Sequence, residues 1–209
     1  MIRLLNQVPK KIVMACSGGV DSMAALDFLR RGGREIEVAY FNHNTPHSGY
    51  AQSFVQDYCE SHNLKLITGS TSMKKVGSQS WEEYWRDERY AFLHGLKTPV
   101  VTAHHLDDVC EWWLFSSLHG KPALTPYSNQ NVIRPFLTTP KSVLHAWCDR
   151  KGVPYVEDVS NDDTRYMRNF IRHNMMPHAL HVNPGMRKVL AKKIMEENSV
   201  FFIKEAVAV

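Results

Sequence analysis

Short apolar runs alternate with segments of helical spacing through the first 118 residues, and this order restricts the fold more than any other feature of the sequence. The apolar runs that we expect to be buried strands are residues 11–15, 36–41, 64–68 and 99–103. The segments that we expect to be helices are residues 20–31, 48–63, 80–96 and 106–118. Strands that alternate with helices of this length form βαβ units. The sequence therefore predicts an α/β fold, with an open, mainly parallel sheet and helices on both faces.

Beyond residue 120 the alternation gives way to a loop-like stretch and then to helices. Residues 132–133 are expected to form a short strand. A helix is expected in TTPKSVLHAWCDRKG, with Thr139 as its cap, Pro140 at its first position and Gly152 as its stop. The organisation that we expect is one domain over residues 1–209, with an α/β core at 1–120 and a mostly helical, basic extension at 121–209.

The charge of the extension suits a polyanionic partner. Seven Lys and Arg residues, and no Asp or Glu, lie between Arg165 and Lys193. Such a stretch is typical of nucleic-acid contacts, although solvated helix faces give the same pattern. No apolar run approaches the ~18 residues of a membrane span, and the four cysteines form no C-x-x-C pair. We therefore expect a cytoplasmic protein with reduced thiols and no membrane partner.

The segment S-G-G-V-D-S joins the first expected strand to the first expected helix. Glycines at such a turn let backbone N–H groups approach phosphate oxygens, and the helix N-terminus adds partial positive charge. No lysine follows the glycines, so the segment is not a Walker-type loop. The serines can add hydroxyl donors, and the aspartate can reach a metal or cap the helix. The segment therefore predicts an anion-binding loop made of Ser17, Gly18, Gly19, Asp21 and Ser22.

Three carboxylates lie within five residues at the start of another helix, in TAHHLDDVCEWW. Helical spacing puts His104, Asp108 and Glu111 on one side, with Asp107 also within reach of Glu111. Because Mg²⁺ prefers oxygen ligands, Asp108 and Glu111 are its expected ligands. Ordinary capping by acidic residues in the first helical turn is the alternative. The two histidines lack a third ligand at a spacing that zinc would need.

Two further segments carry arginines at helical steps. In WEEYWRDERYAFL, Glu82 and Arg86 are four residues apart and Arg89 shares the face of Arg86; a surface ion pair is the plainer interpretation. Arginines with interleaved aromatic residues can clamp phosphates and stack on bases, although a plain basic helix face is the alternative. The second segment has this composition, with Arg165, Arg168, Asn169 and Arg172.

Together these motifs resemble those of the tRNA(Ile)-lysidine synthetase family of PP-loop ATP pyrophosphatases. The resemblance runs in order through most of the chain: S-G-G-V-D-S at 17–22, F-N-H-N at 41–44, Glu82 with Arg86, Arg89 and Tyr90, T-A-H-H-L-D-D at 102–108 with Glu111, R-P-F-L at 134–137, the long motif at 158–172, and N-P at 183–184. The long motif is the most diagnostic. Sulfur-inserting tRNA thiolases share the loop but are expected to carry cysteine pairs, which this sequence lacks.

The resemblance implies a Rossmann-like core and a two-step reaction that uses ATP and Mg²⁺. ATP would adenylate the C2 oxygen of the wobble cytidine of a tRNA(Ile) with a CAU anticodon, releasing pyrophosphate. The ε-amine of free lysine would then displace AMP. With a pKa of about 10.4, that amine needs a base at neutral pH, and the three carboxylates are the candidates.

The residue roles are also implied by the resemblance. The expected catalytic residues are Asp21, Asp107, Asp108, Glu111 and Arg86. His104 joins the loop residues at ATP. The expected contacts to the tRNA substrate are Glu82, Arg89, Arg134, Arg165, Arg168, Asn169 and Arg172.

The sequence also departs from the family pattern. Val109 and Trp112 stand where the family has Gln and Thr, and the family's C-terminal tRNA-binding domains are expected to be absent, which predicts a short form with the catalytic domain only. The oligomeric state is left open, a homodimer included. The alternatives are a PP-loop enzyme that acts on another tRNA base or a small molecule, and an inactive tRNA-binding module.

Overall fold

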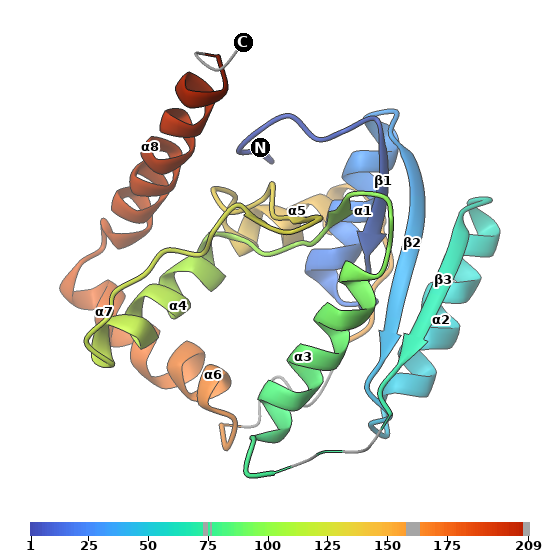
Figure 1. Ribbon diagram of the computed structural model, residues 1–209, viewed down its shortest axis with the longest axis horizontal. Helices are drawn as coiled ribbons and strands as arrows, with labels where there is room; N and C mark the ends of the chain where they lie inside the picture. Colours follow the sequence, from blue (N-terminus) through green and yellow to red (C-terminus); the bar gives the residue numbers. More distant parts are fainter. Residues whose placement is uncertain (73–74, 76, 158–163, 207–209) are drawn as a thin grey trace.

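The computed structural model is built on one sheet of six strands (Figure 1). It describes residues 1–72, 75, 77–157 and 164–206, with side chains up to residue 198. The strand order is β3-β2-β1-β4-β6-β5, and only β5 and β6 pair antiparallel. This order confirms the mainly parallel sheet that the sequence predicts. The strands are β1 (Lys11–Ala15), β2 (Glu35–Asn42), β3 (Lys65–Ser70), β4 (Val100–Val101), β5 (Ser128–Asn129) and β6 (Val132–Ile133).

Helices cover both faces of the sheet, because successive strand residues point to opposite sides. The helices are α1 (Val20–Arg31), α2 (Ser48–Ser61), α3 (Trp81–His94), α4 (Leu106–Leu118), α5 (Lys141–Lys151), α6 (Met167–Phe170), a π-helical turn η2 (Ile171–Met175), α7 (Met176–Val182) and α8 (Met186–Ala206). Ile12 and Met14 of β1 pack in one core with α1, α2 and α5, whereas Val13 packs in another core with α3.

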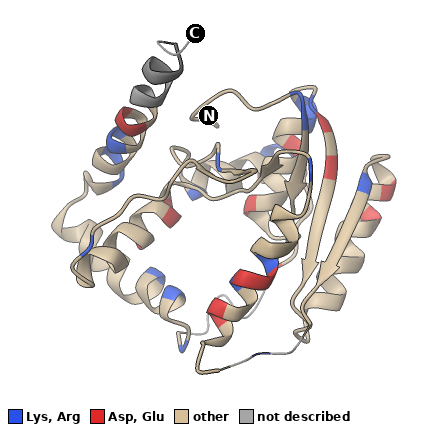
Figure 2. Cartoon of the chain, in the orientation of Figure 1, with Lys and Arg blue, Asp and Glu red and all other residues tan. Residues whose placement is uncertain are grey.

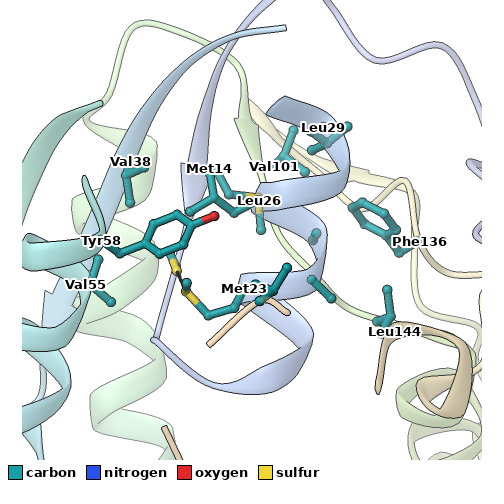
Figure 3. Packing of buried hydrophobic residues seen from close by; sticks show 14 of the residues in the cluster. Met14, Met23, Leu26, Leu29, Val38, Val55, Tyr58, Val101, Phe136 and Leu144 are labelled. Carbon is teal, nitrogen blue, oxygen red and sulfur yellow. Dashed lines mark hydrogen bonds between the residues drawn. The ribbon is translucent and has the colours of Figure 1, made fainter. Parts of the chain in front are cut away.

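Helix α1 is the centre of the larger core (Figure 3). Its Met23, Leu26 and Leu29 are buried at helical spacing, and Leu144 of α5 packs into the same cluster. A charged residue is buried with them: Asp27 accepts hydrogen bonds from Arg30, Arg31 and the indole nitrogen of Trp147. Helix α1 is therefore held by its apolar contacts and by the bond from Trp147, and its N-terminus has a fixed position at the carboxyl end of β1.

A separate core forms among the helices on the left of Figure 1. Val109 and Cys110 of α4 pack with Ile171, Met176 and residues of α8. Helix α4 thus packs with the C-terminal helices, while β6, which follows it in sequence, belongs to the sheet. These contacts cross the expected boundary at residue 120. Among the described helices, none combines the length and the apolar character needed to cross a bilayer.

Several local expectations differ from the structure. The strand expected at 99–103 is limited to β4, because the chain leaves the sheet to begin α4, and β5 was not expected. Thr139 does not cap α5: its hydroxyl bonds the backbone of Arg3, and Pro140 occupies the cap position without a side-chain bond. Gly152 ends α5 with a φ of 62°, as expected. The expected contacts of residues 158–163 lie outside the described residues.

The sheet order places the ends of β1 and β4 next to each other. From β1 the chain continues to β2 on one side, and β4 lies on the other side. In open α/β sheets, ligands bind at the carboxyl ends of the strands where the order reverses in this way. The loop after β1 and the turn after β4 therefore lie side by side at the carboxyl ends of these strands. They hold the two motifs that carry most of the expected chemistry.

Candidate active site

The loop between β1 and α1 has the geometry of an anion-binding turn. Gly18 has a φ of +84°, and a Cβ placed there would lie 3.3 Å from Val55, so this position needs glycine. Gly19 precedes α1, and within the described chain no side chain caps that helix. The first backbone N–H groups of α1 are therefore available to an anion.

The two serines of the loop bond each other and the loop backbone. Their hydroxyls lie 3.2 Å apart, and the Ser22 hydroxyl also donates to the Gly19 carbonyl at 2.9 Å. The Ser17 backbone N–H donates to Ser22 at 3.2 Å. These bonds fix the shape of the loop.

The turn between β4 and α4 brings a buried histidine to this loop. His105 is 2% exposed, and its Nε2 lies 3.5 Å from Asp21 Oδ2. Its Nδ1 accepts from the Asp108 backbone N–H at 3.3 Å, while Asp108 Oδ2 accepts from the His105 backbone N–H at 2.9 Å. This capping box starts α4. One side chain thus links the anion-binding loop to the carboxylates of α4.

Two arginines from the C-terminal helices complete the site. Arg172 donates to Glu111 Oε1 at 2.7 Å and to Asp108 Oδ1 at 3.3 Å. Arg168 also donates to Asp108 Oδ1, and its Nε lies 3.4 Å from Glu111 Oε2. Both carboxylates are buried, whereas Arg168 is 51% exposed. The expected grouping of Asp108 with Glu111 is present, and the two arginines balance its charge.

Asp107 points to a different partner. Its Oδ1 accepts from Arg187 Nη2 at 2.6 Å, and its Oδ2 accepts from the Lys141 backbone N–H at 2.8 Å. A cavity of about 190 Å³ has two of the three carboxylates of this helix in its wall, which is made of Asp107, Glu111, Lys141, Arg172, Met176, Pro177, Leu180 and Arg187. Asp107 and Glu111 therefore face one cavity, but Asp107 does not share the arginines of Glu111.

The charges of the site change the pKa values of its groups. Burial alone would raise the pKa of Asp108, but the charges of His105 and Arg168 outweigh it and keep the pKa well below its usual range. Burial acts to lower the pKa of His105, and Asp108 and Asp21 outweigh it, so that pKa is raised. His104 differs, because burial lowers its pKa to about 3. His104 is therefore neutral at pH 7, with Nδ1 at 2.8 Å from the Thr102 hydroxyl.

Asp21 offers a further carboxylate oxygen to a cation, beside the expected pair Asp108 and Glu111. Asp21 Oδ1 is buried and has no hydrogen-bond partner among the described residues, which is unusual for a carboxylate oxygen. Mg²⁺ takes one or two carboxylates and fills its other positions with water and phosphate oxygens. Asp108 and Glu111 already bind Arg168 and Arg172. No group of three or more His, Cys, Asp or Glu residues in the described ranges could hold a metal by itself.

Three arginines surround the ring of Tyr90 near this site. The guanidinium carbons of Arg86, Arg89 and Arg134 lie 5.9, 5.5 and 5.9 Å from the ring centre. Arg134 is buried and donates to the Tyr90 hydroxyl at 2.9 Å, so it positions Tyr90. The expected Glu82–Arg86 ion pair is not formed within the described residues, because Arg86 lies against Tyr90.

Buried nitrogen atoms without partners lie beside these arginines. They are Arg89 Nε, Trp85 Nε1 and His43 Nδ1, which bond no described residue. Burial, with the nearby Arg89 charge, lowers the pKa of His43 to about 4. Arg89 is also close enough to His104 to lower the pKa of that histidine. The α3 side of the site therefore carries positive charge and unused donors, which suit an anionic or polar ligand.

The remaining expected residues lie at the margin of the site. Arg165 is exposed just before α6, and Asn169 is half-buried within it. Sequence reasoning missed His105 and Arg187. The signal for His105 was the H-H-L-D-D spacing, in which a histidine stands three residues before Asp108, the distance of a helix cap. Arg187 pairs with Asp107 across 80 residues, and no local spacing reports such a contact.

Comparison with known proteins gives one family and a set of relatives. The model of a family described as the PP-loop domain matches residues 2–179. A tRNA(Ile)-lysidine synthase from Lactiplantibacillus plantarum is 32% identical over an alignment 198 residues long, which covers 86% of this chain and 44% of that protein. A protein of the same name from Thermotoga sp. is 32% identical, and the match covers 88% of this chain and 48% of that protein. Another from Persephonella marina is 29% identical, and the match covers 84% of this chain and 43% of that protein. The chain spans about half the length of the curated relatives it matches.

Proposed function

The chain belongs to the PP-loop domain family, and from this premise we propose that it uses ATP to join lysine to C2 of the wobble cytidine of tRNA(Ile). The proposal rests on one observation above all. The loop aspartate, the α4 carboxylates and the arginines of the long motif are connected through His105. These are the segments on which the sequence resemblance depends. The relatives named tRNA(Ile)-lysidine synthase support the same reaction.

The first step is transfer of AMP to the cytidine. The C2 oxygen attacks the α-phosphorus of ATP, a P–O bond to the cytidine forms, and the bond to pyrophosphate breaks. We assign the leaving pyrophosphate to the backbone N–H groups after Gly18 and Gly19 and to the N-terminus of α1. Asp21 would hold Mg²⁺, which when bound neutralises charge on the leaving pyrophosphate. Neutral His104 is assigned to the nucleotide.

The second step needs a neutral amine. The ε-amine of lysine attacks C2, the C–O bond to AMP breaks, and the nitrogen loses a proton to a base. Hydrogen bonds from the Lys141 N–H and Arg187 outweigh burial and lower the pKa of Asp107, and the pKa of Asp108 is also low. We assign the base role to Glu111 on its position, because it lines the cavity that we assign to lysine; its ion pairs with Arg168 and Arg172 have to open for it to take the proton.

The same cavity suits a free amino acid. Its wall offers carboxylates for an ammonium group and the cations Arg172, Arg187 and Lys141 for a carboxylate. The apolar side chains of Met176 and Leu180 are available to the methylene groups of lysine. We assign the cytidine and its flanking phosphates to the Tyr90 side, where Arg86 and Arg89 are available. Arg165, Arg168 and Asn169 extend this basic region.

The test is to identify the product. The protein is incubated with a tRNA(Ile) transcript that carries a CAU anticodon, with ATP, Mg²⁺ and lysine, and the RNA is then digested to nucleosides. Mass spectrometry should find a nucleoside heavier than cytidine by one lysine less one water. An Asp21→Asn protein is the matched control, because it keeps the fold and removes the charge assigned to the ATP side. A wild-type reaction in which cytidine stays unmodified contradicts the proposal.

A further inference from the structure

A row of aromatic rings runs along α4, starting beside the site. Trp112 stacks on Phe115 with ring centres 5.7 Å apart, and Phe115 lies 4.3 Å from His119. Trp112 is four residues after Asp108, so it lies on the same face of the helix, ~6 Å further along its axis. We call Trp112, Phe115 and His119 the α4 aromatic row. The row therefore continues the face of α4 that carries the site's carboxylates.

The Trp112 end of the row, next to the site, is open to solvent. Phe115 covers one side of the Trp112 indole, and Trp112 still keeps 38% of its surface exposed. Phe115 and the neighbouring Trp113 both pack against the helical core. A large aromatic side chain that is held in place by a second ring and left exposed is a rigid, flat surface. Such a surface is suited to stacking against another flat ring.

Basic residues lie at the start of α4, one helical turn before Trp112. Arg168, whose guanidinium binds Asp108 and Glu111, is 51% exposed. In Figure 2, basic positions and no acidic ones lie along α6 and the turn after it. From Arg165 to Lys193 the sequence has seven cations and no acidic residue. Exposed aromatic rings beside arginines are typical of surfaces that bind single-stranded nucleic acid.

We propose that the α4 aromatic row stacks on an unpaired base of the RNA, beside the nucleotide that enters the site. This inference rests on the proposed function and adds a contact of this chain's own, because Trp112 stands where the family pattern has threonine. Stacking accepts any base, so the row would contribute affinity for an open loop and little sequence selectivity. Paired bases in a duplex are not available for the contact.

The test compares two RNA probes at one fixed salt concentration, because salt changes all such affinities. One probe is an anticodon stem-loop with an unpaired CAU loop, and the other is the same stem as a blunt duplex. Trp112→Ala and Trp112→Leu should weaken binding of the stem-loop by about 5- to 100-fold, and neither should change binding of the duplex. Trp112→Phe should keep the affinity within about threefold. Leu118→Ala, which removes another exposed apolar side chain from α4, should have no effect.

Two controls keep the result interpretable. Unfolding midpoints of the Trp112 variants show that each is folded at the temperature of the binding assay, and Trp112→Leu should stay closer to the wild type than Trp112→Ala because it keeps an apolar contact with Phe115. Lysidine formation by the same wild-type preparation is measured in parallel. If lysidine forms and Trp112→Leu binds the stem-loop as tightly as wild type, the row is not a base platform. Binding that depends on Trp112 without lysidine formation supports the row and overturns the proposed reaction. If Trp112→Ala instead separates a dimer with RNA affinity unchanged, the row is a contact between copies, and the inference is overturned.

Discussion

At the scale of single residues, the site depends on a histidine that connects two motifs. His105 contacts Asp21 with one ring nitrogen and the start of α4 with the other. Its side chain is not expected to touch the reacting atoms, because it is buried between the carboxylates of Asp21 and Asp108. We therefore regard it as a positioning residue: it sets the distance between the proposed ATP side and the proposed lysine side.

Replacement of His105 separates its two tasks. His105→Asn keeps a side chain that can cap α4 but is too short to reach Asp21, so stability should change little while kcat for AMP formation falls by about 100-fold. His105→Ala should lose the cap as well and destabilise the fold by about 1 kcal/mol more. Urea unfolding and steady-state AMP release measure the two effects. Equal kcat in His105→Asn and wild type would remove the positioning role.

Asp27 provides a test of stability that is independent of the site. Burial acts to raise its pKa, but hydrogen bonds from Trp147, Arg31 and Arg30 outweigh it, so the pKa in the folded protein is lowered. A lowered carboxyl pKa stabilises the fold above the unfolded value of about 3.9, and this contribution is lost as the pH falls below it.

The matched variant is Asp27→Asn, which keeps the shape and removes the charge. It should lower the free energy of unfolding by about 1–3 kcal/mol at pH 7. The difference from wild type should be constant from about pH 5 to pH 7 and should shrink below about pH 4. Urea unfolding at several pH values measures it. A difference that persists unchanged at acid pH would mean that the charge of Asp27 does not stabilise the fold.

At the scale of elements, α3 packs on the sheet through a close contact between its Phe92 and Gly69 of β3. A Cβ added at Gly69 would lie 2.5 Å from Cδ2 of Phe92 and 2.8 Å from its Cγ. The whole ring would have to move, since the contact is with its inner atoms. The arginines beside Tyr90 are carried by the same helix, so its seat also sets their positions.

Gly69→Ala should therefore destabilise the protein by about 1–3 kcal/mol through overpacking. In a Phe92→Leu background the smaller side chain leaves room, so the same substitution should cost clearly less. Denaturant unfolding of the four proteins in this cycle gives the coupling between the two positions. Additive effects of the two substitutions would show that Phe92 is not the group that the new methyl displaces.

The elements also show where sequence reasoning succeeds. Helix α1 was predicted with its observed bounds, because its apolar spacing begins after Gly19 and ends at Gly32. Strand β5 was missed, since two exposed polar residues carry no periodic signal. Thr139 looked like a helix cap, but its hydroxyl is used by Arg3 far away in sequence. Local patterns predict elements well, whereas contacts made through the tertiary fold override them.

The candidate site follows the same division. The loop residues and the Asp108–Glu111 pair could be predicted, because each lies within one short segment. The roles within the site could not, since Asp107 turns to Arg187 and the other two carboxylates share Arg168 and Arg172. These partners come from helices at the other end of the chain. The resemblance named the segments, and only the structure pairs their side chains.

At the scale of the whole molecule, the sheet and the C-terminal helices meet where the proposed chemistry takes place. The loop after β1 supplies Asp21, and α6 with η2 supplies Arg168 and Arg172 (Figure 1). His105 and the start of α4 lie between them. We propose that this arrangement couples ATP cleavage to lysine transfer on one RNA base.

The most direct measurement follows both products in one reaction. AMP release from ATP labelled at the α-phosphate and incorporation of labelled lysine into tRNA(Ile) are counted in the same tubes. We expect equal amounts of AMP and of incorporated lysine, faster AMP release when lysine is added, and loss of both products in Asp21→Asn. AMP release that lysine does not accelerate, or lysine that never enters the RNA, would contradict the proposed function.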